Sequence, residues 1–138
     1  MACEAEVAAA ANWFAEELFE PNEQRTIFCT RLQELLIARY RGHWYPDEPH
    51  RGCAFRALLS TINSLDPLLL RAADSTGHRG LQESFMRQFS DAGEVTCWVR
   101  QCFLVPLTLS LQQRLRCLSL SVMRGPGHTA PPRSYCAR

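Results

Sequence analysis

The sequence predicts a small domain of the α+β class, in which helices and strands share one core. Its 138 residues suffice to bury a core and fit one domain better than two. A content of 46% hydrophobic and 21% charged residues is typical of a globular protein rather than a disordered chain. Four segments carry helix signals, whereas two others lack them and favour strands. A mixed helix-and-strand domain is therefore expected.

The first two helices are predicted by apolar spacing and by the residues that separate them. The segment from Glu4 to Glu20 places its larger apolar residues on one helical stripe, with carboxylates on the other face. A proline then breaks the pattern, and Asn22 is a good N-cap for a second helix that runs to about Tyr40. Gly42 is its expected C-terminal stop. The stripes expected to face each other are Val7, Phe14 and Leu18 in the first helix, and Phe28, Leu32, Leu35, Leu36 and Tyr40 in the second.

The middle of the chain is expected to form a loop, a weak strand, two further helices and a second strand. Prolines forbid a regular helix from His43 to Gly52, and residues 53–59 carry few helix signals. Asp66 and Pro67 are a cap and first-position pair for a short helix that runs to residue 74. Residues 81–89 repeat apolar side chains at helical spacing, and the β-rich segment 94–99 follows after a turn.

The chain changes character after Val99. Leucines between positions 104 and 118 fit a helical stripe, but over residues 107–111 they also fit strand alternation. Periodicity therefore leaves the structure of residues 100–124 open. Residues 125–138 are rich in Gly, Pro, Ser and Thr without an apolar repeat, which predicts a flexible tail.

Charge and composition exclude several classes of function. Fifteen basic residues against fourteen acidic ones leave a formal charge of +1, so there is no basic excess for binding a nucleic-acid backbone. The N-terminal segment lacks the basic residues of a secretory signal, and the apolar run Cys102 to Leu111 is only about half the length that crosses a bilayer. The seven cysteines are an odd number and are expected as free thiols inside the cell. We therefore expect neither direct nucleic-acid binding nor membrane insertion.

A Cys/His hydrolase or metal protein is a minor alternative. Cys53 lies near His50 and His43 in the sequence as a thiol and a base would, but no third orienting group accompanies them. His50 and Cys53 also have a usable spacing for zinc, yet Cys97 and Cys102 are four residues apart and do not supply a second ligand pair. The chain lacks a glycine-rich phosphate loop. The expectation is a protein without catalytic activity, metal or cofactor.

The most distinctive stretch lies between the second predicted helix and the weak strand. It reads Tyr40-Arg41-Gly42-His43-Trp44-Tyr45-Pro46-Asp47-Glu48-Pro49, followed by His50-Arg51-Gly52-Cys53-Ala54-Phe55-Arg56. At nearly every anchor position this stretch resembles the first signature box of the BTG/Tob antiproliferative family. Leu32 to Leu36 before it and Asp66-Pro67 after it also resemble the family, in the same order.

The second signature box of that family is only partly present. Val95 to Val99 is similar to its start, but Arg100 to Leu104 stands where the family has Asp, Pro, an aromatic residue, Glu and Val. The resemblance covers residues 5–99, so we divide the chain into a BTG/Tob-like domain (1–99), a divergent apolar segment (100–124) and a tail (125–138). Losing the family's last strands is expected to expose a sheet edge. A truncated form with weakened or no partner binding is therefore the main alternative.

The resemblance implies a fold, a function and a partner. The implied fold is a single small α+β domain of about four to five helices packed on a short, mostly antiparallel sheet. The implied function is that of a monomeric antiproliferative adaptor, cytoplasmic and nuclear, without enzymatic activity of its own. Its implied partners are the catalytic exonuclease subunit of the mRNA deadenylase complex, whose poly(A) shortening it regulates, and transcription factors.

The resemblance also places the contact residues on positions of this sequence. Partner contacts are expected from four rings, which supply the large, rigid contact area of interface hot spots: His43, Trp44, Phe55 and Trp98. Trp44 and Phe55 each have the alternative role of filling the core. Polar contacts at the rim of the interface are expected from charged neighbours: Asp47, Glu48, Arg51 and Arg56.

Overall fold

The computed structural model describes residues 3–48, 51–90, 92–99 and 120–124, which form four helices and three strands. In chain order these are α1 (Glu4–Leu18), α2 (Glu23–Tyr40), β1 (Ala57–Thr61), α3 (Pro67–Asp74), α4 (Leu81–Phe89), β2 (Glu94–Val99) and β3 (Leu120–Arg124). The strands form one antiparallel sheet in the order β1-β2-β3. The predicted α+β class is thereby confirmed.

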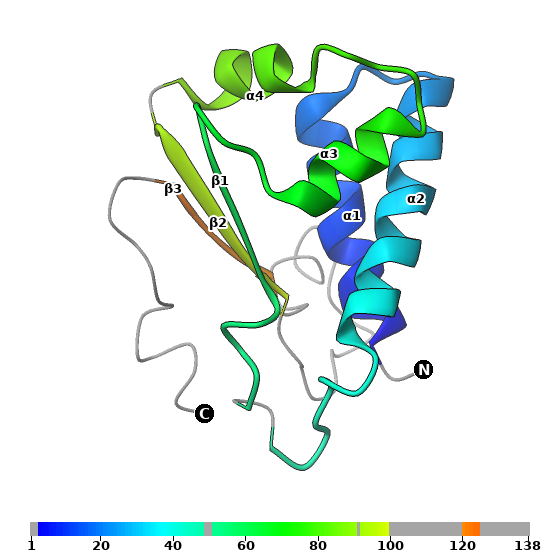
Figure 1. Ribbon diagram of the computed structural model, residues 1–138, viewed down its shortest axis with the longest axis vertical. Helices are drawn as coiled ribbons and strands as arrows, with labels where there is room; N and C mark the ends of the chain where they lie inside the picture. The colour runs from blue at the N-terminus through cyan, green and yellow to red at the C-terminus, as the bar shows by residue number, and fades with distance from the viewer. Residues whose placement is uncertain (1–2, 49–50, 91, 100–119, 125–138) are drawn as a thin grey trace, which may run out of the picture.

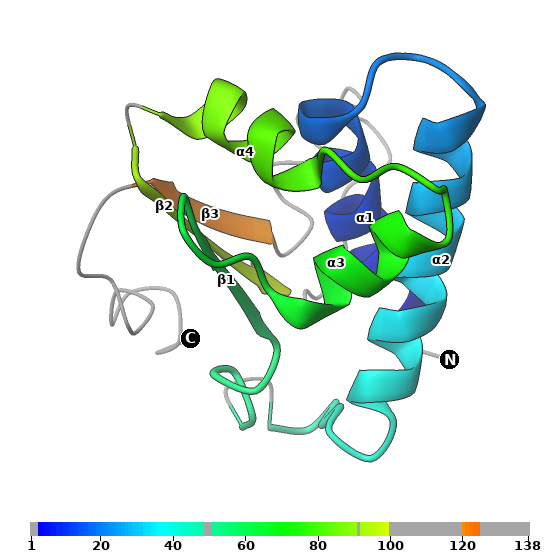
Figure 2. The same cartoon turned by 45° about the horizontal axis from the view of Figure 1, so that its top comes forward.

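The core lies between the helices and one face of the sheet. Helices α1 and α2 pack side by side, α3 packs against α2, and α4 crosses the end of the domain near α1 (Figures 1 and 2). From the sheet, Leu58, Val95, Cys97 and Val99 belong to the same buried cluster as the apolar stripes of the helices. The described helices include none with the length and apolar character that crossing a bilayer requires.

The helix ends follow the local signals in the sequence. The Asn22 side chain accepts a hydrogen bond of 3.2 Å from the backbone N–H of Arg25 at the start of α2. The Asp66 carboxylate accepts one of 2.9 Å from the N–H of Leu68 at the start of α3. Gly42, with φ of 77°, turns the chain after α2 in the left-handed region that glycine tolerates best. These caps confirm the predicted boundaries of α2 and the predicted start of α3, whereas α1 ends at Leu18, before the predicted end at Glu20.

The weak strand predicted at residues 53–59 begins later than expected, at Ala57. The backbone N–H of Arg56 donates to the carbonyl oxygens of Gly52 and Cys53, both at 3.2 Å, so the residues before β1 form tight turns. The strand then pairs with β2 from Ala57 opposite Trp98 to Thr61 opposite Glu94. Turn hydrogen bonds thus replace the first half of the expected strand.

The expectation of an exposed sheet edge is wrong for β2. Its second edge pairs with β3 along its length, from Val95 opposite Arg124 to Val99 opposite Leu120. Strand β3 belongs to the segment 100–124 whose structure the sequence left open. The run Cys102 to Leu111 and the predicted tail 125–138 lie outside the described residues.

Candidate functional site

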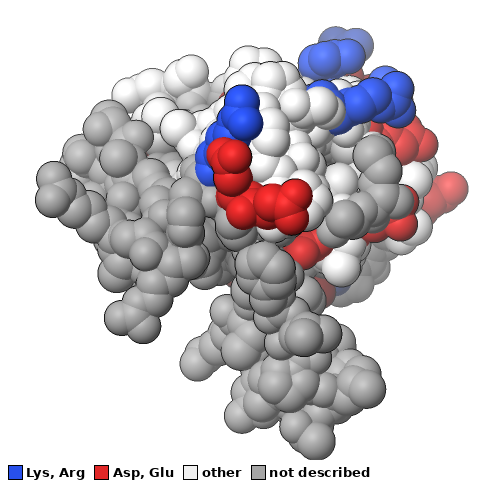
Figure 3. Space-filling view, turned by 90° about the horizontal axis from the view of Figure 1, so that it is seen from below, with Lys and Arg blue, Asp and Glu red and all other residues white. Residues whose placement is uncertain are grey.

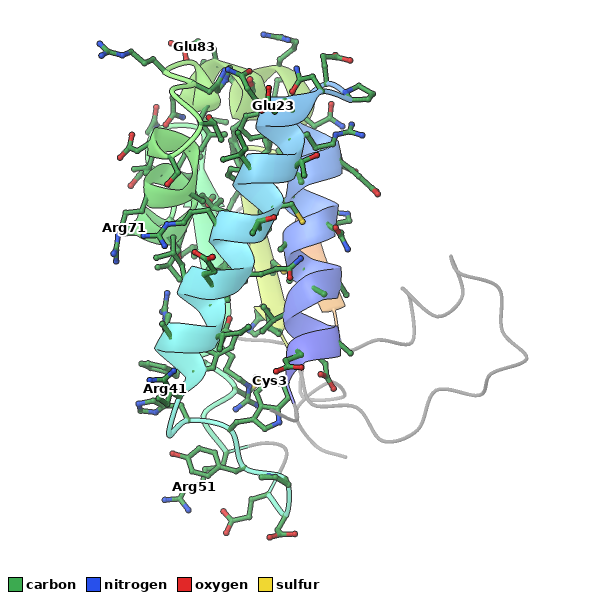
Figure 4. The ribbon with its side chains drawn as sticks, turned by 90° about the vertical axis from the view of Figure 1, so that its right-hand side faces the viewer. Cys3, Glu23, Arg41, Arg51, Arg71 and Glu83 are labelled. Atoms are coloured by element: carbon green, nitrogen blue, oxygen red, sulfur yellow. The ribbon has the colours of Figure 1, made fainter. Side chains whose placement is uncertain are left out.

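The segment that joins α2 to β1 projects from one end of the domain as a series of turns. Figure 4 shows Arg41 where α2 ends and Arg51 in the loop beyond it. The turns are closed by local backbone hydrogen bonds, from the N–H of His43 to Tyr40 (2.8 Å), of Glu48 to Tyr45 (3.1 Å), and of Arg51 to Glu48 (2.9 Å). The first signature box therefore forms a folded protrusion on the end of the helical layer.

Two of the predicted contact residues form a ring pair at this end, with Phe55 exposed and His43 half-buried. The rings of His43 and Phe55 stack with centroids 4.0 Å apart and planes 24° apart, and Phe55 is 39% exposed. The Arg39 guanidinium carbon lies 5.2 Å from the centre of the Phe55 ring. One guanidinium nitrogen of Arg39 also lies 4.0 Å from the Asp66 carboxylate. We call His43 and Phe55 the Phe55–His43 pair.

Trp44, which follows His43 in the sequence, packs toward the core. It is half-buried against the core, with its ring centroid 6.4 Å from that of Tyr40 and 5.2 Å from the Arg56 guanidinium carbon. Its indole N–H is buried and has no hydrogen-bond acceptor in the described structure. Trp44 therefore anchors the loop to the core with its apolar ring, at the cost of one unsatisfied donor.

Trp98 and Arg56 lie inside the molecule. Trp98 is 1% exposed and stands in β2 on the sheet face opposite to Cys97, outside the cluster that the helices cover. In this conformation its ring is not at the surface where the resemblance places a partner contact. Arg56 is 0% exposed, which corrects its expected place on the polar rim. Its side chain donates hydrogen bonds to backbone carbonyl groups instead.

The other three rim residues are exposed at the tip of the protrusion. A guanidinium nitrogen of Arg51 lies 3.7 Å from a Glu48 carboxylate oxygen, and the Arg51 guanidinium carbon lies 4.4 Å from the Tyr45 ring centre. Asp47 is exposed beside them. Figure 3 views the domain from this end and shows acidic and basic side chains next to one another, not a surface of one sign. Such charges suit the rim of an interface more than its centre.

The Cys/His alternative finds little support in this geometry. Cys53 is 8% exposed, and His50 lies outside the described residues. Among the residues that the structure describes, no group of three His, Cys, Asp or Glu side chains is arranged to hold a metal ion. Two hollows of about 430 and 450 Å³ involve α4 and share His78, but neither is lined by a described residue of the segment 43–56. Neither of these hollows is therefore part of the protrusion.

Two residues of this region were not predicted to belong to the site. Arg39 flanks the exposed Phe55 ring, and the buried Tyr40 hydroxyl donates a 3.0 Å hydrogen bond to the Arg56 carbonyl oxygen. Arg39 lies four residues before His43, on the last turn of α2. This spacing could have indicated in advance that the two side chains lie near each other. Tyr40 was predicted from its apolar spacing as a core residue, and the role of its hydroxyl depends on tertiary contacts.

Comparison with known proteins agrees with the signature box. The sequence profile of the BTG family matches residues 3–101. The chain is 35% identical to Protein BTG1 of Homo sapiens over 99 residues, which are 68% of this chain and 54% of BTG1. It is 32% identical to Protein Tob1 of Mus musculus over 74 residues, 52% of this chain and 20% of Tob1. A BTG family protein of Dictyostelium discoideum is 35% identical over 100 residues, 66% of this chain and 23% of that protein.

The relatives are longer than the region that matches. The chain spans about a fifth of the length of Tob1 and about half of the length of BTG1. The profile match nevertheless extends over most of the chain, from α1 through the end of β2. On these grounds the chain belongs to the BTG family.

Proposed function

We propose that this domain is a non-catalytic, antiproliferative adaptor that binds the catalytic exonuclease subunit of the mRNA deadenylase complex. The chemistry of poly(A) shortening then belongs to the partner, and the adaptor decides where it acts, in the cytoplasm or, with transcription factors, in the nucleus. The Phe55–His43 pair, with its exposed Phe55 ring, is the observation that carries this proposal. The resemblance of the first signature box to the BTG/Tob family supplies the identity of the partner.

The chemistry of the ring pair supports a role in protein docking. An exposed phenylalanine stacked on an imidazole offers a flat apolar surface for a partner. The phenylalanine side chain has few rotamers, so it loses little conformational entropy on binding. Arg39 borders this surface, and Asp47, Glu48 and Arg51 surround the tip of the loop with charges of both signs. An apolar centre with a mixed polar rim is the usual anatomy of a protein interface.

The proposal is tested by titrating the full chain against the purified exonuclease subunit in a calorimeter. The Phe55→Ala variant should weaken binding by about 30-fold or more, because truncating a hot-spot aromatic residue costs about 2 kcal/mol or more. The matched control is Met86→Ala, which truncates a side chain that is 46% exposed on α4, at the opposite end of the domain (Figure 1). The control should bind within about two-fold of the original chain.

The outcomes separate the proposal from the truncated-form alternative. Binding that is lost with Phe55→Ala and kept with Met86→Ala supports the adaptor function. If the intact chain does not bind the exonuclease subunit, the proposal fails and the truncated form is favoured, because Arg100 to Leu104 replaces half of the second signature box. If both variants bind equally well, the Phe55–His43 pair is not the docking surface.

A further inference from the structure

A single buried side chain joins three segments of the candidate site. The Arg56 Nη1 donates to the carbonyl oxygens of His43 at 3.1 Å and of Arg51 at 2.8 Å, one near each end of the protruding loop. Its Nε donates to the carbonyl oxygen of Val99 at 3.1 Å, at the end of β2. The guanidinium group therefore links the first signature box to the strand that carries the start of the second.

The surroundings are shaped for a planar guanidinium. Gly52 has φ of 71°, and a Cβ at this position would lie 3.3 Å from Arg56 Nη1, so a glycine lets the group approach the backbone. Trp44 lies beneath the same group, and the Tyr40 hydroxyl holds the Arg56 carbonyl oxygen at 3.0 Å. A lysine ammonium is a compact point charge on a flexible stem, and it does not reproduce this fixed fork of donors.

The loop has mainly local hydrogen bonds of its own. The described backbone bonds from His43, Glu48 and Arg51 each close a turn that reaches back three residues. Turns of this kind hold a loop's local shape but do not fix its direction relative to the sheet. The hydrogen bonds from Arg56 fix this direction, because their acceptors lie on the loop and on β2. The β2 acceptor, Val99, is 43 residues away from Arg56 in the sequence.

We propose that Arg56 is the positioning residue of the docking surface, which fixes the loop against the end of β2 before any partner arrives. This inference rests on the proposed function only for its consequence, which is that a loop held in its binding shape loses less conformational freedom on docking. Arg56 itself is 0% exposed and does not touch the partner. Its contribution to binding is made entirely through the residues that it holds.

The first test uses the full chain alone and measures amide hydrogen exchange by NMR. In Arg56→Lys the amides of Glu48 and Arg51 should exchange about ten-fold faster or more, while the buried turns of α2 keep their protection. Arg71→Lys, a change in an exposed arginine of α3, is the control and should leave the loop unchanged. Equal loop exchange in a folded Arg56→Lys variant overturns the inference, and so does an equal acceleration throughout α2.

A second variant tests the role of Arg56 if Arg56→Lys does not fold. Gly52→Ala keeps the guanidinium but places a Cβ against Nη1 in a backbone conformation that favours glycine, so it should also accelerate loop exchange selectively. Unchanged exchange in Gly52→Ala would then count against the role of Arg56.

The second test measures the affinity for the exonuclease subunit. In Arg56→Lys the fraction of molecules whose loop is in the binding conformation should fall, and the apparent Kd should rise by the same factor. The Kd of the control Arg71→Lys should equal that of the original chain. Faster loop exchange without any change in Kd overturns the link between loop order and docking. If the original chain does not bind at all, the proposed function fails, whereas the exchange experiment still decides the role of Arg56.

Discussion

The burial of Trp98 leads to a quantitative prediction about its truncation. Trp98 is 1% exposed in the middle strand of the sheet, opposite Ala57 in β1 and Ser121 in β3. Replacing a buried tryptophan by alanine removes its apolar contacts and leaves a cavity, which together cost about 3–5 kcal/mol. Because a domain has only about 5–15 kcal/mol of stability, Trp98→Ala should lower the free energy of unfolding by about a fifth or more.

Urea unfolding followed by circular dichroism measures this difference. Trp98→Ala should reduce the unfolding free energy by about 4 kcal/mol, and in a thermal scan it should lower the melting temperature by roughly 15 °C. Phe55→Ala, which truncates a ring that is 39% exposed, should cost only about 1–2 kcal/mol. If Trp98→Ala is as stable as the original chain within about 0.5 kcal/mol, the reasoning is refuted and Trp98 returns as a candidate surface contact.

Further predictions concern pH and the helix caps. Burial raises the pKa of the Cys97 thiol and of the Tyr40 phenol above their ordinary values of 9.0 and 10.0. The unfolded chain therefore loses these protons first, so the stability they contribute is complete at lower pH and falls as the pH rises above about 9 for Cys97 and above about 10 for Tyr40, by up to about 1.4 kcal/mol per pH unit for each group. In urea titrations between pH 8 and 10.5, Cys97→Ala should reduce this slope. Asp66→Ala, which removes the cap of α3 from Leu68, should cost about 1–2 kcal/mol at pH 7, and Asp66→Asn should keep most of the capping. Asn22→Ala should cost about 1 kcal/mol by the loss of the α2 cap, as measured by thermal unfolding.

The stability predictions bear on any test of docking. A buried tryptophan and an exposed phenylalanine can both abolish binding when truncated, the first by unfolding the domain and the second by removing a contact. A loss of exonuclease binding by Trp98→Ala is therefore informative only if the variant is shown to be folded. Phe55→Ala is the sharper probe, because its expected effect on stability is small and its side chain already faces solvent.

The amino-acid sequence by itself determined the helices, one strand and the location of the candidate site. The ends of α2 and α3 are set by Asn22 and Asp66, whose side chains cap the backbone within three residues, so a local reading finds them. The loop with its Pro, Gly and aromatic residues was recognised from its order alone. Such features depend on neighbours in the chain, which the sequence displays directly.

The tertiary structure decided which side chains of that site are buried. Arg56 reads as a surface charge in the sequence, yet its acceptors include Val99, 43 residues away, and only the folded sheet brings that carbonyl within reach. The same applies to β3, which belongs to the segment 100–124 whose structure periodicity left open and which pairs with the edge of β2. Burial of a polar group depends on partners distant in sequence, and periodicity along one segment contains no information about them.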